Sequence, residues 1–156
     1  MFPILFALAL QSSSERLPKA GLVPAPSMED QSVLAPINQL FAAFQAGDSA
    51  AMLRLVYPDG RVTANGTLRS GAGLRQESWM QFASKVKPGD GWQETISDPA
   101  IEVDGDIAMV WAPFVVRAGG KVSNCGFDHF DLVRDNGAWK VMNLTFSSRI
   151  TGCPAE

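Results

Sequence analysis

The sequence has 156 residues, of which 46% are hydrophobic and 19% are charged, and its formal net charge is −3. This length corresponds to about one domain, and the apolar share is too high for a disordered chain. No cluster of lysine and arginine supplies the positive surface that nucleic-acid binding requires, and no apolar run approaches the roughly 20 residues of a membrane helix. With two cysteines and one histidine, a zinc site would need carboxylates among its ligands, so we predict neither a metal site nor a cofactor.

The N-terminal residues differ in character from the rest of the chain. Residues 1–10 are apolar, small and polar residues follow, and residues 15–29 are rich in proline. We predict a signal peptide in residues 1–14 and a linker in residues 15–29, and therefore a periplasmic or secreted protein. Pro3 and the lack of an early lysine or arginine favour the alternative, a cytoplasmic protein whose N-terminal strand or helix packs on the domain.

The chain that follows has the spacing of amphipathic helices. Apolar residues in 32–45 recur at offsets of four, seven, eight and eleven, which predicts a helix that Pro36 either kinks or begins. Gly47-Asp48 ends this helix and caps a second one, which runs to the turn at Tyr57–Gly60. A third helix is predicted from about residue 74 to residue 86.

From Trp92 onward the pattern changes to strands and tight turns. Alternating or apolar runs are separated by three turn signals: Asp104-Gly105, Gly119-Gly120 and Asn136-Gly137. Three helices followed by four or five long strands predict an α+β fold. In this fold the helices cover one face of a strongly curved antiparallel sheet of four to six strands.

The last hairpin decides which side chains face inward. A two-residue turn at Asn136-Gly137 would pair Phe130 with Asn143, whereas a three-residue loop would pair Phe130 with Leu144. We prefer the second register because it gathers the apolar residues Phe130, Leu132, Met142, Leu144 and Phe146 on one face. The outer face would then carry an apolar patch for a homodimer, formed by Val133, Trp139 and Val141.

Asp128 and His129 are the candidate catalytic residues. In the preferred register Asp128 lies on the apolar inward face, where burial would raise its pKa and fit it to act as an acid or a base. The alternative is an aspartate at the open end of the sheet, either solvated or capping a backbone N–H. His129 then faces outward beside Asp131, whereas in the other register it enters the cavity and Asp128 leaves it.

The expected state of the two cysteines, Cys125 and Cys153, depends on the compartment in which the protein resides. In an exported protein they could form a disulfide, because Gly152 lets the chain turn back towards the strand that holds Cys125. Two free thiols are the alternative.

Three segments of the sequence carry a resemblance to a known family: VLAPINQLFAAFQAGD, YPDG and DHFDLVRDNGAWKVMNL. Residues 30–149 resemble the nuclear transport factor two-like superfamily, in particular its SnoaL-like branch of unassigned function, and leave residues 150–156 as a tail. The resemblance implies a cone-shaped, cystatin-like α+β roll with an apolar pocket. Members include enzymes, ligand binders and association domains, so the fold does not decide the function.

Ketosteroid isomerase, a member of this superfamily, allows a comparison residue by residue. It uses a tyrosine, a basic aspartate and a protonated aspartate. Asp128 resembles the protonated aspartate in position, but Leu40 and Ala64 stand where the other two groups would be. The resemblance therefore does not imply ketosteroid isomerase activity for this chain.

Three functions remain open. We favour binding of a small apolar molecule in a pocket lined by Phe41, Tyr57, Trp79, Phe130, Leu144 and Phe146. One alternative is a cofactor-independent isomerase, dehydratase or cyclase that uses Asp128 as its acid or base. The other is a non-catalytic dimerisation domain. We expect a binding protein rather than an enzyme.

Overall fold

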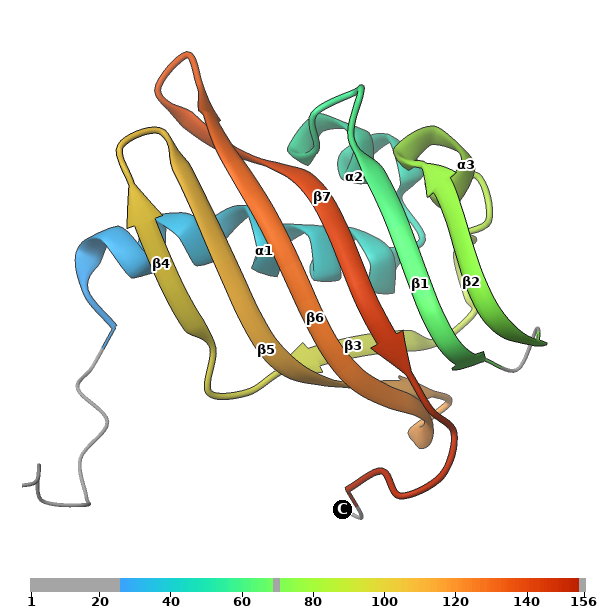
Figure 1. Ribbon diagram of the computed structural model, residues 1–156. Helices are drawn as coiled ribbons and strands as arrows, with labels where there is room; N and C mark the ends of the chain where they lie inside the picture. Colours follow the sequence, from blue (N-terminus) through green and yellow to red (C-terminus); the bar gives the residue numbers. More distant parts are fainter. Residues whose placement is uncertain (1–25, 69–70, 155–156) are drawn as a thin grey trace, which may run out of the picture.

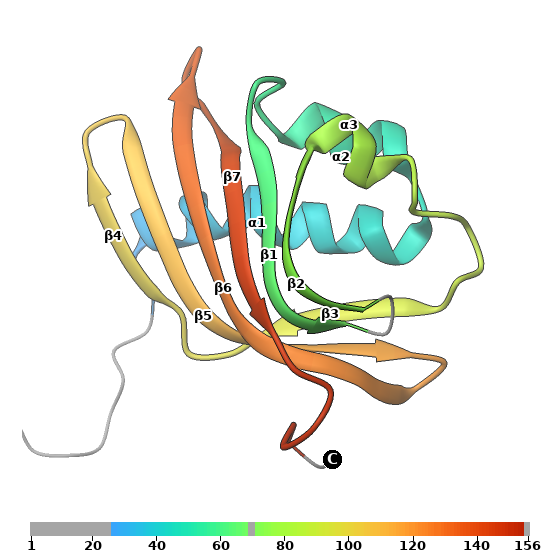
Figure 2. The ribbon, with the colours of Figure 1, turned by 45° about the vertical axis from the view of Figure 1, so that its right-hand side comes forward.

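The computed structural model describes residues 26–68 and 71–154, and the predicted signal peptide lies outside these ranges. It confirms the predicted α+β roll: a strongly curved sheet bends around three helices, as Figures 1 and 2 show. Within the described residues, no helix is long and apolar enough to cross a membrane.

The two N-terminal helices begin and end at the residues that cap them. α1 (Met28–Ala46) starts at Ser27, whose side chain accepts from the Asp30 N–H, so the helix begins within the segment predicted as linker. Gly47 ends it with φ +68°, and Pro36 lies inside the helix rather than in its first turn. Asp48 caps α2 (Ser49–Leu55) by accepting from the Ala51 N–H, as the sequence predicts.

The sheet has seven strands, more than predicted, and one of its pairs is parallel. Its strands are β1 (Arg61–Leu68), β2 (Gly71–Ser78), β3 (Trp92–Ile96), β4 (Ala100–Asp104), β5 (Ile107–Ala118), β6 (Lys121–Asp135) and β7 (Ala138–Ser148). The order is β2-β1-β7-β6-β5-β3, with β4 beside the other end of β5 and β1 parallel to β7. β3 and β4 therefore pair with opposite ends of the long, bent β5, both along the edge of β5 that faces away from β6.

The third helix is shorter than predicted. α3 (Trp79–Ala83) has Ser78 as its N-cap, and the residues before it form β2, which pairs with β1. The predicted helix started at residue 74, but only its apolar residues from Trp79 onward have helical spacing. Residues 74–78 carry no such period, since Leu74 is followed by four polar residues, and pairing with β1 makes them part of a strand.

The β6–β7 hairpin combines parts of both predicted registers. Asn136 and Gly137 both have positive φ and form a two-residue turn, so Leu132 lies opposite Val141. A bulge at Met142 then shifts the register, and Phe130 lies opposite Leu144, as predicted. Because the two-residue turn places Val141 opposite the inward-facing Leu132, Val141 also points inward and is fully buried, whereas the sequence prediction placed it on the outer face.

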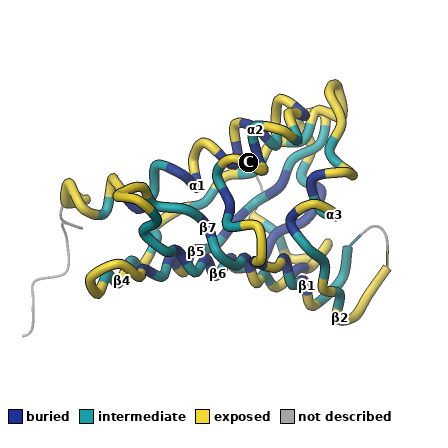
Figure 3. Tube along the Cα trace, turned by 90° about the horizontal axis from the view of Figure 1, so that it is seen from above, coloured by how far each residue is buried: buried dark blue, intermediate teal, exposed yellow. Residues whose placement is uncertain are grey.

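The core fills the space between α1 and the concave face of the sheet. It includes Val33, Ile37 and Leu40 of α1 and Val110, Phe130 and Val141 of the sheet. Figure 3 shows the buried residues of α1 and of the central strands in dark blue. Beyond this core, towards β3, the concave side of the sheet opens into a cavity.

Candidate functional site

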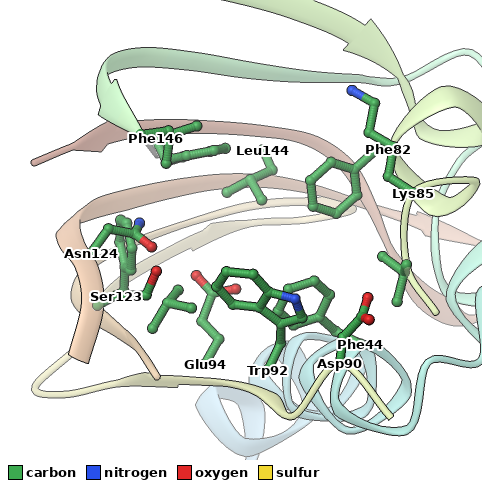
Figure 4. Close-up of a pocket in the computed structure, with 14 residues that line it drawn as sticks. Phe44, Phe82, Lys85, Asp90, Trp92, Glu94, Ser123, Asn124, Leu144 and Phe146 are labelled. Atoms are coloured by element: carbon green, nitrogen blue, oxygen red, sulfur yellow. The ribbon is translucent and has the colours of Figure 1, made fainter. Parts of the chain in front are cut away.

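A cavity of about 320 Å³ opens between α3, the C-terminal end of α1 and the bent part of the sheet (Figure 4). Its walls are mostly aromatic and aliphatic: Phe44, Leu68, Phe82, Val86, Trp92, Phe114, Val116, Leu144 and Phe146. Its polar residues are Lys85, Asp90, Glu94, Ser123 and Asn124. Apolar walls with a few placed polar groups are typical of small-molecule sites.

The aromatic walls come from three parts of the fold. Phe44 of α1 stacks on Phe82 of α3, with ring centroids 6.3 Å apart. On the sheet side Phe114 and Phe146 meet edge to face at 6.0 Å. Trp92, the first residue of β3, completes the enclosure. Flat aromatic faces therefore line the cavity on several sides.

A bulge in β6 brings two neighbouring polar residues to the cavity. Val116 pairs with Asn124 and Arg117 pairs with Val122, so Ser123 is the extra residue of the bulge. In a regular strand, adjacent side chains point to opposite faces. The extra residue lets both Ser123 and Asn124 line the cavity, which is a recognised use of bulges near binding sites.

Hydrogen bonds fix the orientation of the Asn124 side-chain amide. Ser148 Oγ donates its single proton to the Thr67 carbonyl at 2.9 Å. It must therefore accept from Asn124, whose Nδ2 lies 3.2 Å away. The Asn124 Oδ1 atom is then directed away from Ser148, and Figure 4 shows it on the cavity side. Asn124 thus offers the cavity an acceptor.

Glu94 is the carboxyl group that lies inside the cavity, whereas Asp90 is exposed at its rim. It lies two residues after Trp92 on β3, so both side chains point to the same side of the strand. Figure 4 shows its carboxyl group directed into the cavity beside Trp92 and Ser123. Burial among apolar walls disfavours its charged form and raises the pKa of Glu94 from 4.5 to about 8.

Asp128, the predicted acid or base, faces inward but does not reach the cavity. Its side chain is 0% exposed, and neither carboxyl oxygen has a hydrogen-bond partner among the described residues. Burial, and after it the neighbouring charge of Glu94, raise the pKa of Asp128 well above its usual range. Because it has no exposed surface, Asp128 does not touch a molecule in the cavity. Its direct action on a substrate finds no support in this geometry.

The structure divides the predicted pocket residues into two groups. Leu144 and Phe146 line the cavity. Phe41, Trp79 and Phe130 do not: they belong to the packed core, where the rings of Phe41 and Phe130 meet edge to face. Trp79 also donates from Nε1 to the Met142 carbonyl at 2.9 Å. The sequence prediction took large inward aromatics as pocket walls, whereas these three pack against one another's neighbours in the closed core between the helices and the sheet.

Tyr57 is likewise absent from the cavity lining. It lies in the turn after α2, where its backbone N–H donates to the Val141 carbonyl at 2.8 Å. Its side chain is half-buried. The sequence predicted Tyr57 as a pocket residue because its hydroxyl group could supply a polar contact. The structure places it at the other end of the sheet from β3.

His129 lies on the convex face of the sheet, as the preferred register predicts. Its imidazole is near the Trp111 ring at 6.0 Å, and Nε2 lies 3.5 Å from an Asp131 carboxylate oxygen. The predicted dimer patch needs correction, because Trp139 and Val141 pack on the concave side. There the Arg134 guanidinium covers the Trp139 ring at 4.4 Å.

A disulfide joins Cys125 and Cys153 and ties the C-terminal residues to β6. Cys125 also exchanges two backbone hydrogen bonds with Arg149, of 2.9 and 3.0 Å. The bond therefore fixes the chain that follows β7 close to the strand segment that carries Ser123 and Asn124. Within the described ranges no group of three or more histidine, cysteine, aspartate or glutamate side chains is placed to hold a metal ion.

The sequence prediction missed Glu94, Ser123 and Asn124. For Glu94 a signal existed: in Trp92–Ile96 every second residue is apolar except Glu94, so a carboxylate shares a face with Trp92 and Ile96. Nothing comparable marks Ser123 or Asn124, because only the β6 bulge turns both of them inward.

Comparison with known proteins agrees with the architecture. The model of a protein family described as "Putative lumazine-binding" matches residues 28–147. No curated protein matches the chain. Solved structures match at low identity, and such a likeness concerns the fold alone.

Three of these structures illustrate the similarity. One is a protein of unknown function with a cystatin-like fold from Nostoc punctiforme, with 12% identity, TM-score 0.63, and coverage of 80% of this chain and 95% of that chain. One is a protein of unknown function from Mycobacterium tuberculosis, with 17% identity, TM-score 0.65, and coverage of 78% and 72%. An NTF2-like protein with a cystatin-like fold from Novosphingobium aromaticivorans has 15% identity, TM-score 0.63, and coverage of 80% and 83%.

The family match spans the described fold from the start of α1 to residue 147 of β7 and includes all 14 residues that line the cavity. The chain therefore belongs to the "Putative lumazine-binding" family and has the NTF2-like, cystatin-like fold.

Proposed function

We propose that the protein binds a small, flat, two-ring molecule in the cavity between α3 and the sheet. The observation that carries this proposal is the cavity itself, in which aromatic walls surround a short row of polar groups. Its volume supports the ligand size. An apolar cavity of about 150 Å³ holds benzene, so about 320 Å³ has room for two fused rings.

The walls also support a flat ligand rather than a flexible chain. Phe82, Trp92 and Phe146 offer ring faces and edges on different sides of the cavity, and aromatic pairs gain about 0.5–1.5 kcal/mol beyond burial of their area. The family description names lumazine, a two-ring pteridine with ring carbonyl and N–H groups. A molecule of this size and polarity matches the cavity, which makes lumazine the first probe.

Calorimetric titration with lumazine at pH 6 tests this proposal. We expect the wild-type protein to bind one equivalent, and Phe82→Ala to weaken the affinity about tenfold, because it removes an aromatic wall. Phe127→Ala is the matched control: it removes a phenyl ring from the convex face and should leave the affinity unchanged. Absence of binding, or an equal loss in both variants, would contradict the proposal.

We further propose that two copies associate through the convex face of the sheet. The residues that support this are not the predicted ones: Trp111 is 47% exposed and stacks on Phe127, with Met109 and Val133 on the same face. An exposed apolar group of this kind suits a protein interface.

Sedimentation velocity tests this association. The wild-type protein should sediment as a dimer and Trp111→Glu as a monomer, since the new charge would be buried between the copies. A monomeric wild-type protein, or a variant that remains dimeric, would contradict the assignment of the face.

We also propose that the protein is exported to the periplasm or the exterior. This proposal rests on the apolar residues 1–10 of the sequence. The Cys125–Cys153 disulfide is consistent with an oxidising compartment such as the periplasm or the exterior.

A further inference from the structure

Glu94 is placed to select among two-ring molecules by the chemistry of their polar edge. We propose that the ligand is a neutral ring lactam whose –NH–C(=O)– edge pairs with the Glu94 carboxyl group. This inference rests on the proposed function, because it specifies which class of flat molecule the cavity takes.

The position of Glu94 in the sheet supports an edge contact. Glu94, Val116 and Asn124 form one row across β3, β5 and β6. Strands are spaced about 4.8 Å apart, so Glu94 and Asn124 stand roughly 10 Å apart with an apolar residue between them. Figure 4 shows the Glu94 carboxyl group beside the Trp92 indole. A flat ring stacked on that indole would therefore have Glu94 along one edge.

The surroundings of Glu94 favour its neutral form. Apart from Ser123, the cavity wall around it is mostly apolar, and the inward-facing Asp128 is a second carboxyl group whose charge would repel that of Glu94. Lys85 is 67% exposed and is paired with Glu77, so it does not neutralise Glu94. Asp90 is exposed at the rim, and α1 contributes only Phe44 to the wall.

A neutral carboxyl group has a donor and an acceptor side by side. The hydroxyl can donate to the lactam carbonyl while the carboxyl oxygen accepts from the lactam N–H, and both bonds form without any change of charge. A carboxylate ligand would add negative charge next to two carboxyl groups. A hydrocarbon would displace water from the Glu94 carboxyl group without offering it a hydrogen bond, at a cost of about 1–3 kcal/mol.

Asn124 would select for a polar group on the edge of the ligand opposite the one that pairs with Glu94. Asn124 is buried, with 6% of the residue exposed, and its Oδ1 acceptor faces the cavity. Two-ring lactams that carry a second N–H opposite the first would meet this acceptor. The preferred ligands are therefore polar at both ends and flat between them.

A matched set of probes tests the inference: 2-quinolone, which is a two-ring lactam; coumarin, in which oxygen replaces the N–H; and naphthalene, which has no polar edge. At pH 6 we expect 2-quinolone to bind about tenfold more tightly than coumarin, because it makes one more hydrogen bond. Between pH 6 and pH 9.5 its affinity should fall about tenfold, since the ionised carboxylate repels the lactam oxygen. Naphthalene should show no such fall.

Two variants identify the group responsible. Glu94→Gln retains a donor and an acceptor, so it should keep the preference for 2-quinolone and lose the pH dependence. Glu94→Leu should bind 2-quinolone, coumarin and naphthalene with similar affinity. Circular dichroism and thermal melting of both variants establish that they are folded.

The outcomes separate this inference from the proposed function. If 2-quinolone, coumarin and naphthalene bind with equal affinity and without pH dependence, the cavity binds flat molecules but Glu94 does not select lactams. A pH dependence that persists in Glu94→Gln also overturns the inference. If none of the probes binds and lumazine does not bind either, the proposed function itself fails.

Discussion

Replacing Phe130 with alanine should lower the free energy of unfolding by about 3–5 kcal/mol, which is the cost of removing a phenyl ring from a closed core. Phe130 is 0% exposed, lies between Val110 and Leu144 in the sheet, and contacts Phe41 of α1 edge to face. Urea denaturation followed by circular dichroism measures the change.

Phe127→Ala, three positions earlier on the same strand, is the matched control. Phe127 lies on the convex face and is only half-buried, so its removal should cost about 1 kcal/mol or less. If Phe130→Ala costs as little as the control and weakens ligand binding more than Phe82→Ala does, Phe130 lines a cavity after all. The assignment of Phe130 to the core would then be wrong.

Raising the pH from 5 to 9 should destabilise the protein through Glu94 and Asp128. In the unfolded chain Glu94 ionises near pH 4.5, whereas in the folded protein its pKa is about 8. Between these values the folded state binds more protons than the unfolded state, so stability falls as the pH rises. The loss is complete above about pH 8 and is on the order of 4 kcal/mol for Glu94 alone.

Thermal melting as a function of pH measures this effect. The melting temperature should fall by on the order of 10 °C from pH 5 to pH 9 in the wild-type protein. Glu94→Gln should flatten the curve, because glutamine does not titrate. Asp128→Asn should raise the melting temperature at high pH, where a buried charge is most costly. A wild-type curve that is flat, or that rises with pH, would contradict the burial of these carboxyl groups.

The fold could be predicted from the sequence because its largest elements have clear periodicity. The apolar stripe of α1, the capping residues Gly47 and Asp48, and the turn at Asn136-Gly137 all act locally, and the structure agrees with them. The register of β7 beyond the last turn could not be predicted from such local signals. The Met142 bulge depends on how β7 packs beneath the helices and beside β1, and the two-residue alternation of a strand cannot reveal it.

The site was less predictable than the fold for a related reason. Asp128 could be assigned to the inward face, because alternation places it on the same face as the apolar Phe130 and Leu132. Alternation does not say whether an inward residue meets a helix or an open space. Phe130 faces α1, and Glu94 faces the cavity beyond the end of α1. That distinction depends on the length of α1 and on the bend of β5, which no local pattern specifies.

The most direct test of the account is a ¹H–¹⁵N spectrum of the tryptophan indole groups during a titration with lumazine. Trp92 lines the cavity, Trp79 is buried in the core, and Trp111 lies on the convex face. We predict that the indole signal of Trp92 shifts with saturation while those of Trp79 and Trp111 remain in place. A shift confined to Trp111, or no shift of any indole signal at saturating lumazine, would contradict binding in this cavity.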